Sequence, residues 1–140
     1  MERIVVGVDG SEAAFEALQW AVDEARRRNA TVEAVYAWHQ PFVGGYSYMG
    51  EIDLGYYEEE ARQVLDQAVD AVDASGIPPI ERTLTAGGAA GVLVEAAKGA
   101  ALLVVGSRGR GGFSGLLLGS VSQQAAHHTP CPIVIIPPAA

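Results

Sequence analysis

The stretch that decides the fold is residues 102–122, LLVVGSRGRGGFSGLLLGSVS. It begins with four apolar residues, which is typical of a buried strand in a parallel sheet. Glycines follow at positions 106, 109, 111, 112, 115 and 119. The run from Ser120 to Gln123 then has the Ser-x-x-Gln pattern that caps a new helix. Because a strand, a glycine-rich loop and a helix start bring backbone N–H groups and the positive helix end together, the stretch predicts an anion-binding site.

The charges of this loop are all positive. Arg108 and Arg110 lie in it, and no Asp or Glu occurs between Glu95 and the end of the chain. In a chain with a formal net charge of -8, a loop free of carboxylates favours a bound phosphate. We expect the two arginines either beside that phosphate or in solvent. The alternative interpretation of the whole loop is a flexible surface segment whose glycines only form turns.

Three well-known motifs are absent from the stretch. A Walker-type loop needs Lys and then Ser or Thr where this chain has Gly112 and Phe113. No Gly-x-Gly-x-x-Gly pattern follows a strand, so the dinucleotide fingerprint is missing. Leu116 stands where a Gly-x-Ser-x-Gly nucleophile elbow needs its second glycine.

The spacing of three glycines carries a specific resemblance. Gly106-x-x-Gly109, nine residues and then Gly119-Ser120 is similar to the nucleotide-binding motif of the universal stress protein family. Asp9 and the closing run 131–135, CPIVI, also resemble that family. The resemblance covers essentially the whole chain, residues 1–140, as a single domain.

The resemblance implies an adenine nucleotide as ligand. ATP, with or without Mg²⁺, is the first expectation, and AMP or cyclic AMP are the alternatives. Asp9 matches the family aspartate near the ribose and adenine, and Ala37 aligns with a position that contacts adenine through its backbone. Family positions that hold the ribose and phosphates are matched by Gly106, Gly109, Gly119, Ser120 and Val121. Val105 and Arg108 complete our set of candidate binding residues.

Composition excludes several classes of protein. With 140 residues, of which 49% are hydrophobic, the chain is long enough for one domain with a sizeable core. The acidic balance argues against non-specific binding to nucleic acid or to anionic membrane surfaces. Cys131 is the only cysteine, so no internal disulfide forms. We recognise neither a signal peptide nor an apolar run of membrane-spanning length, and a cytoplasmic protein is the expectation.

Strands and helices are expected to alternate along the chain. Apolar runs predict strands at residues 4–8, 31–38, 80–85, 102–105 and 133–136. Helical spacing predicts helices from Ser11, the expected N-cap, to residue 28, from the Glu58–60 run to about residue 73, over about 90–98 and from Ser120 to about His128. The acidic set Asp66, Asp70 and Asp73 is interpreted as a solvated helix face.

This alternation predicts an α/β fold, a doubly wound five-stranded parallel sheet with helices on both faces and strand order 3-2-1-4-5. In such sheets ligands bind beyond the carboxyl ends of the strands, where the strand order switches. Asp9 ends the first strand and Gly106 ends the fourth, so the fold brings them to one cleft. Asp9 before Gly10-Ser11 also has a simpler interpretation as a turn former.

Residues 39–55 are the longest segment without a predicted element. It carries Tyr46, Tyr48, Met49 and four glycines. We consider a flap over a bound base and a disordered insertion or dimer contact as equal alternatives.

Two functions remain open, and binding is favoured over turnover. Phosphoryl transfer needs metal ligands and a positioned base or water, and the glycine loop offers arginines but neither a lysine nor a carboxylate. A slow ATPase or phosphotransferase is therefore the alternative, and a scaffold with an empty cleft is disfavoured by the glycine motif. Ile133–Ile136 is apolar on both faces and is expected at a sheet edge, which predicts a homodimer through this strand.

Overall fold

The computed structural model describes residues 1–39, 54–108 and 119–137. Five strands and four helices alternate through these residues. They are β1 (Arg3–Val8), α1 (Glu12–Arg28), β2 (Thr31–Trp38), α2 (Leu54–Ala71), β3 (Glu81–Ala86), α3 (Ala89–Ala96), β4 (Leu102–Gly106), α4 (Ser120–His128) and β5 (Ile133–Ile136). All pairings are parallel and the sheet order is β3-β2-β1-β4-β5, which confirms the predicted fold.

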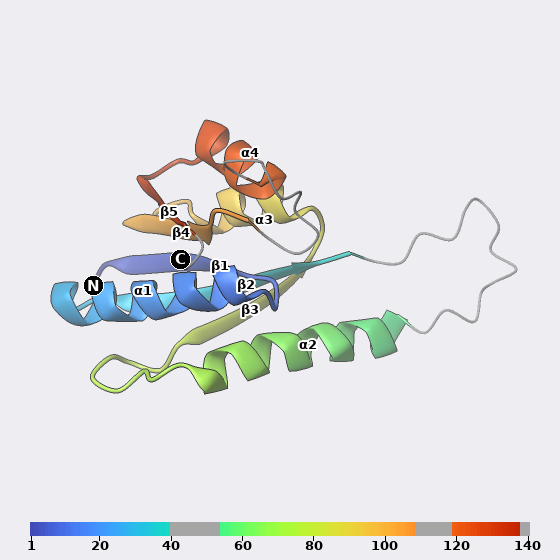
Figure 1. Ribbon diagram of the computed structural model, residues 1–140, viewed down its shortest axis with the longest axis horizontal. Coiled ribbons are helices and arrows are strands. Elements are labelled where there is room, and N and C mark those ends of the chain that lie inside the picture. Colours follow the sequence, from blue (N-terminus) through green and yellow to red (C-terminus); the bar gives the residue numbers. More distant parts are fainter. Residues whose placement is uncertain (40–53, 109–118, 138–140) are drawn as a thin grey trace, which may run out of the picture.

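The helices cover both faces of the sheet, and each face has its own core (Figure 1). Side chains alternate along β1, so that Ile4, Val6 and Val8 pack in the cluster with α1 and α2. Val5 points to the other face, into the cluster that contains Leu93 of α3 and Ala125 of α4. The central strands are therefore buried on both sides, which explains their unbroken apolar sequence.

Helix α1 starts and ends where its sequence indicates. The Ser11 side chain accepts a hydrogen bond from the backbone N–H of Ala14 at 3.1 Å and caps the first turn. The helix ends at Asn29, whose φ of 56° is the left-handed conformation that asparagine tolerates at this position. The predicted apolar stripe is buried, and its members are Ala14, Leu18, Ala21, Val22 and Ala25.

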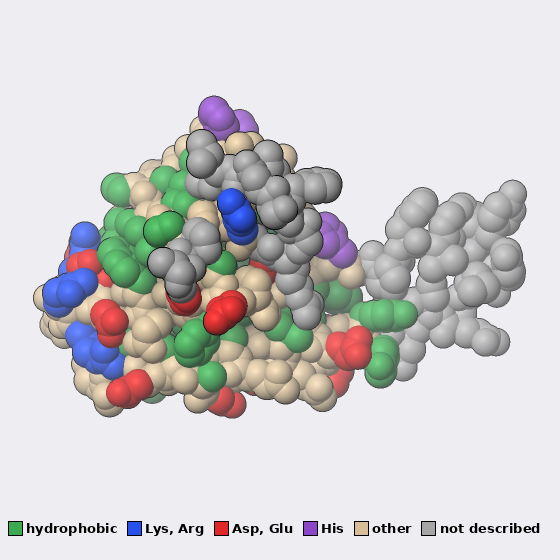
Figure 2. Space-filling view, viewed as in Figure 1, with side chains coloured by type: hydrophobic (Ala, Val, Ile, Leu, Met, Phe, Trp, Pro, Cys, Tyr) green, Lys and Arg blue, Asp and Glu red, His purple; other side chains and the backbone are tan. Residues whose placement is uncertain are grey.

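The basic end of α1 is neutralised by nearby carboxylates. Figure 2 shows blue side chains gathered at one end of the molecule, the end at which α1 finishes. Arg26 lies 2.7 Å from Asp23, while Arg27 and Arg28 each lie 3.5 Å from Glu24. These pairs fit the interpretation that the arginines complement the negative end of the helix.

Helix α2 begins four residues earlier than predicted, at Leu54 instead of Glu58. The signal for the true start is weak, because a glycine and two aromatic residues follow Leu54 and none of them is a strong helix former. The stripe of Leu65, Val69 and Val72 is buried against the sheet as expected.

The acidic side of α2 faces solvent but is partly paired. Asp66 and Asp70 lie 2.9 Å and 2.7 Å from Arg82 of the edge strand β3. Hydrogen bonds to these two carboxylates raise the pKa of the Arg82 guanidinium. The acidic set therefore ties α2 to β3 as well as lying in solvent.

The remaining boundaries either match the prediction or shift by one or two residues. Strand β3 covers Glu81–Ala86 and lies at the edge of the sheet, where charged residues are tolerated, and α3 covers only Ala89–Ala96. Among the described residues, no helix is both long and apolar enough to cross a membrane.

Candidate functional site

The candidate site lies where β1 and β4 end, side by side, at the switch in strand order. Val6 pairs with Val104, so the ends of the two strands, Val8 and Gly106, reach the same edge of the sheet. On the other side of β1, Val8 pairs with Tyr36. Continuing that register by one residue brings Asp9 level with Ala37. The topology thus gathers Asp9, Ala37 and the start of the glycine motif at one edge, as predicted.

Gly106 is required by the close approach of α1. A Cβ at this position would lie 3.0 Å from the Cβ of Ala13 and 3.1 Å from its carbonyl carbon and oxygen. Backbone atoms in the first turn of α1 cannot turn away as a flexible side chain can. The first glycine of the motif therefore lets the start of α1 and the end of β4 share one small space.

Asp9 has the turn-forming role that the simpler interpretation assigned to it. Its Oδ1 accepts a hydrogen bond from the backbone N–H of Ser11 at 2.8 Å. The half-buried carboxylate is thereby fixed beside the cleft. This bond is compatible with the predicted contact to a ribose, which stays a prediction.

The N-cap of α4 differs from the prediction. Gly119, not Ser120, occupies that position, with φ of -73° and ψ of 165°, and no side chain in the described part of the structure caps the helix. The carbonyl of Gly119 accepts the first helical hydrogen bond, from Gln123 N–H at 3.0 Å. Ser120 is thus the exposed first residue of the helix. The Ser-x-x-Gln pattern therefore begins one residue after the N-cap that the backbone uses. The N–H groups at this helix end are consequently not satisfied by a cap of the chain's own.

Two buried polar atoms without a partner lie next to that helix end. Ser107 is 3% exposed, and neither its Oγ nor the buried Nε of Arg108 has a hydrogen-bond partner among residues 1–39, 54–108 and 119–137. The carbonyl of Ser107 accepts from the N–H of Gly119, which places both residues at the start of α4. Orphaned buried polar groups are rare in folded proteins and indicate a missing partner such as a ligand or water.

Ser107 was missed by the sequence interpretation, although a signal for it exists. In the alternation of β4, Leu103 and Val105 face the α3 and α4 side, and Ser107 continues that row. The signal for Ser107 is that a polar residue stands at a position where the strand alternation points the side chain into the core.

The other candidates serve in different ways. Val105 is 4% exposed, so only its backbone groups are available to a ligand, while Val121 is half-buried against the same cluster. Ala37 is half-buried and pairs with Thr85 of β3. Gly109 and Arg110 lie outside the described residues, as does most of the segment 39–55.

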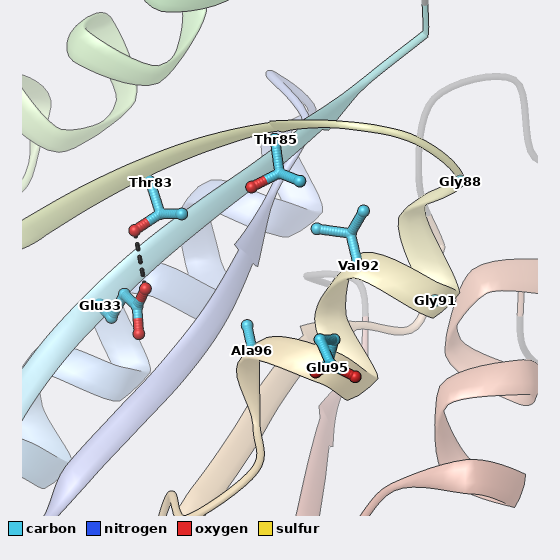
Figure 3. Close-up of a pocket in the computed structure, with 8 residues that line it drawn as sticks. All are labelled: Glu33, Thr83, Thr85, Gly88, Gly91, Val92, Glu95 and Ala96. Atoms are coloured by element: carbon cyan, nitrogen blue, oxygen red, sulfur yellow. Dashed lines mark hydrogen bonds between the residues drawn. The ribbon is translucent and has the colours of Figure 1, made fainter.

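A separate cavity of about 540 Å³ lies between α3 and the strands β2 and β3 (Figure 3). Its carboxylates already have partners. Glu33 accepts from Arg3 and from the hydroxyl of Thr83, both at 2.7 Å, and Glu95 lies 2.8 Å from Lys98. The carboxylates of this cavity are therefore already engaged, unlike the buried Ser107 Oγ and Arg108 Nε near the end of β4. No cluster of three or more His, Cys, Asp or Glu suited to a metal ion occurs in residues 1–39, 54–108 and 119–137.

Comparisons with known proteins agree with this geometry. The model of the universal stress protein family matches residues 1–137. A universal stress protein of Mycobacterium tuberculosis is 35% identical over 137 residues, which cover 97% of this chain and 48% of the relative. The chain thus spans about half the length of the curated relatives it matches.

Solved structures show the same fold. A universal stress protein in complex with cAMP matches with a TM-score of 0.72 and 30% identity over 96% of each chain. The universal stress protein UspA from Lactobacillus plantarum matches with a TM-score of 0.83 over 96% of this chain and 97% of its own. At 24% identity, the second likeness supports the fold alone.

Proposed function

Because the chain belongs to the universal stress protein family, we propose that it binds an adenine nucleotide, ATP in the first place, at the ends of β1 and β4. The observation that carries the proposal is the start of α4, which no described side chain caps, close in the fold to Arg108, whose buried Nε has no partner in the described part of the chain. Helix starts with available N–H groups are natural phosphate sites. The structural relative that holds cAMP supports an adenine nucleotide as the ligand class.

The residues fit such a ligand from its phosphates to its base. The backbone N–H groups at the start of α4 and the hydroxyl of Ser120 would receive phosphate oxygens, with Gly106 and Gly119 allowing close approach. The guanidinium of Arg108 would add charge-assisted hydrogen bonds to the same group. Asp9 suits the ribose hydroxyls, because a carboxylate accepts from hydroxyls and repels phosphates. The backbone of Ala37 would contact the base.

Binding without rapid turnover is the activity we propose. Hydrolysis needs a base or a positioned water near the terminal phosphate. Among the described residues of the cleft, Asp9 is the carboxylate, and it is engaged by the turn at Ser11. A nucleotide held by backbone amides and one arginine would act as a signal of cellular state, in keeping with a regulatory protein.

The direct test is to denature freshly purified protein and identify the released small molecule by mass spectrometry. Calorimetry with ATP, AMP, cAMP and adenosine then ranks the ligands. We expect ATP to bind more tightly than adenosine, because the phosphate site contributes most of the contacts. Absence of any released nucleotide, together with no heat from any of the four compounds, would refute the proposal.

A single-turnover assay with radiolabelled ATP separates binding from hydrolysis. We expect ATP to be recovered unchanged after many minutes. Saturable turnover that disappears in Gly119→Val would instead establish the slow ATPase.

We further propose that two copies of the chain associate through β5. Every residue of Ile133–Ile136 is half-buried, and β5 pairs only with β4 in the described sheet. An apolar edge strand with open hydrogen-bonding groups favours pairing with a second edge. Light scattering at micromolar concentration is expected to report a dimer, and a stable monomer would contradict this proposal.

A further inference from the structure

The two halves of the glycine motif are joined through one carbonyl group. Ser107 and Gly119 stand on either side of residues 109–118, which lie outside the described residues. The N–H of Gly119 donates to the carbonyl of Ser107 at 2.5 Å, while the N–H of Ser107 donates to the carbonyl of Ile136 in β5 at 2.8 Å. Backbone hydrogen bonds therefore connect Gly119, Ser107 and the edge strand β5.

Ser122 adds a second hydrogen bond to the carbonyl of Ser107. Its Oγ lies 2.9 Å from the carbonyl oxygen of Gly119 and 3.1 Å from the carbonyl oxygen of Ser107. The first contact is the ordinary local bond of a helical serine to the preceding turn. The second spans 15 residues of sequence and joins α4 to the end of β4.

The Ser122 hydroxyl has a single proton, which the two carbonyl oxygens share, and its buried environment strengthens that shared hydrogen bond. Ser122 is 2% exposed and Ser107 is 3% exposed, so water does not compete for the carbonyl. A hydrogen bond in such a place is worth more than one at the surface, and removing the donor leaves a buried acceptor less well satisfied.

We propose that Ser122 is a positioning residue for the nucleotide site, which holds the start of α4 in register with the end of β4. The inference rests on the proposed function, because its effect on affinity needs a nucleotide. Ser122 does not need to touch the ligand. It keeps the amides after Gly119 and the residues after Gly106 at a constant separation, so that a phosphate meets donors from both halves without first ordering them.

The chain offers a matched control at the other end of the same helix. The hydroxyl of Thr129 donates to the carbonyl of Cys131 at 2.7 Å, so that it also bridges backbone just beyond α4. Ser122→Ala and Thr129→Val each remove one such hydroxyl. We expect Ser122→Ala to lower ATP affinity about tenfold in calorimetry and Thr129→Val to change it less than about twofold.

Rescue by a conservative variant separates positioning from general stability. Ser122→Thr keeps the hydroxyl but adds a methyl group in a buried place, so it is expected to lower the thermal midpoint while affinity stays within about threefold of the parent. Equal losses of affinity in Ser122→Ala, Ser122→Thr and Thr129→Val would overturn the proposal, and so would an unchanged affinity in Ser122→Ala.

Hydrogen exchange of the free protein tests the contact between Ser122 and the Ser107 carbonyl without any nucleotide. In Ser122→Ala the amide of Gly119 is expected to exchange at least about tenfold faster, while the amides inside β4 keep their protection. Unchanged exchange at Gly119 would refute the role of Ser122 in holding the start of α4 to the end of β4. If exchange at Gly119 rises as expected but the parent protein binds no nucleotide, the proposed function fails and the structural role of Ser122 stands.

Discussion

The two helices that begin at the cleft do so in opposite ways. Helix α1 satisfies its own first turn, because Ser11 caps Ala14 N–H and Asp9 accepts from Ser11 N–H. Helix α4 begins at Ser120 with Gly119 as its N-cap, and none of the described side chains caps its N–H groups. Both lie at the carboxyl edge of the sheet, so the difference is one of side chains and not of place.

This contrast shows which helix end is available to a ligand. A capped end has already used its donors on the chain's own oxygen atoms, one of them the negatively charged carboxylate of Asp9 next to the turn. An uncapped end beside Arg108 keeps its donors and a positive charge. Helix α3 provides a third case, because its N-cap is Gly88 and no side chain caps it.

The largest effect is expected from giving α4 a side-chain cap like the one at the start of α1. Gly119→Asp would place a carboxylate at the N-cap, where it accepts from the helix N–H groups and repels phosphate. We expect ATP affinity to fall at least about 100-fold in calorimetry, with the circular dichroism spectrum unchanged. A variant that still binds ATP within threefold of the parent would place the phosphates elsewhere.

The close approach between the start of α1 and the end of β4 can be disrupted by adding a side chain at Gly106. Gly106→Ala pushes a Cβ against backbone atoms of Ala13, so the free energy of unfolding in urea should fall by about 1–3 kcal/mol. Gly7→Ala is the control, because there the new Cβ meets the end of the Leu93 side chain at 2.9 Å, which can turn aside. If Gly7→Ala lowered the free energy of unfolding as much as Gly106→Ala, our account of the close approach between α1 and β4 would be contradicted.

Removing the cap of α1 should affect stability but not the ligand. Ser11→Ala deletes the bond to Ala14 N–H and is expected to cost about 1 kcal/mol in urea denaturation. ATP affinity is expected to stay within about twofold, because the proposed phosphate site lies at the start of α4 and not of α1. A large loss of affinity would show that α1 also contributes to the anion site.

The smallest effect is expected at α3. A Cβ at Gly88 would meet nothing within 4 Å, so Gly88→Asp can cap the helix without a clash. We expect a gain of about 0.5 kcal/mol in the free energy of unfolding and no change in ATP affinity. A loss of affinity here would mean that Gly119→Asp acts through charge alone and not through its position.

Sequence patterns predicted the elements well where local physics decides them. The Ser11 cap and the end of α1 at residue 28 follow from short-range preferences, and the structure has both of them. The start of α2 and the N-cap of α4 were wrong by four residues and by one. In both cases a persuasive local pattern, the Glu58–60 run or Ser120-x-x-Gln123, did not coincide with the backbone that packing imposes.

The candidate site divides in the same way. The sequence placed Asp9 and Gly106 at one cleft, because parallel strands of known order bring their carboxyl ends together. It did not reveal the orphaned hydroxyl of Ser107 or the bond from Ser122 to its carbonyl. Both depend on which residues meet across a gap of many positions in the chain.

The amino-acid sequence by itself therefore determined the alternating strands and helices and the order of the parallel sheet, since these follow from apolar runs, helix periodicity and the handedness of strand crossovers. Only the tertiary structure decided which helix start lacks a cap and which buried groups lack a partner. Those outcomes depend on distances between segments that lie far apart along the chain. The contact of Gly106 with Ala13 is another such case, because a Cβ added at Gly106 would lie only 3.0 Å from the Cβ of Ala13.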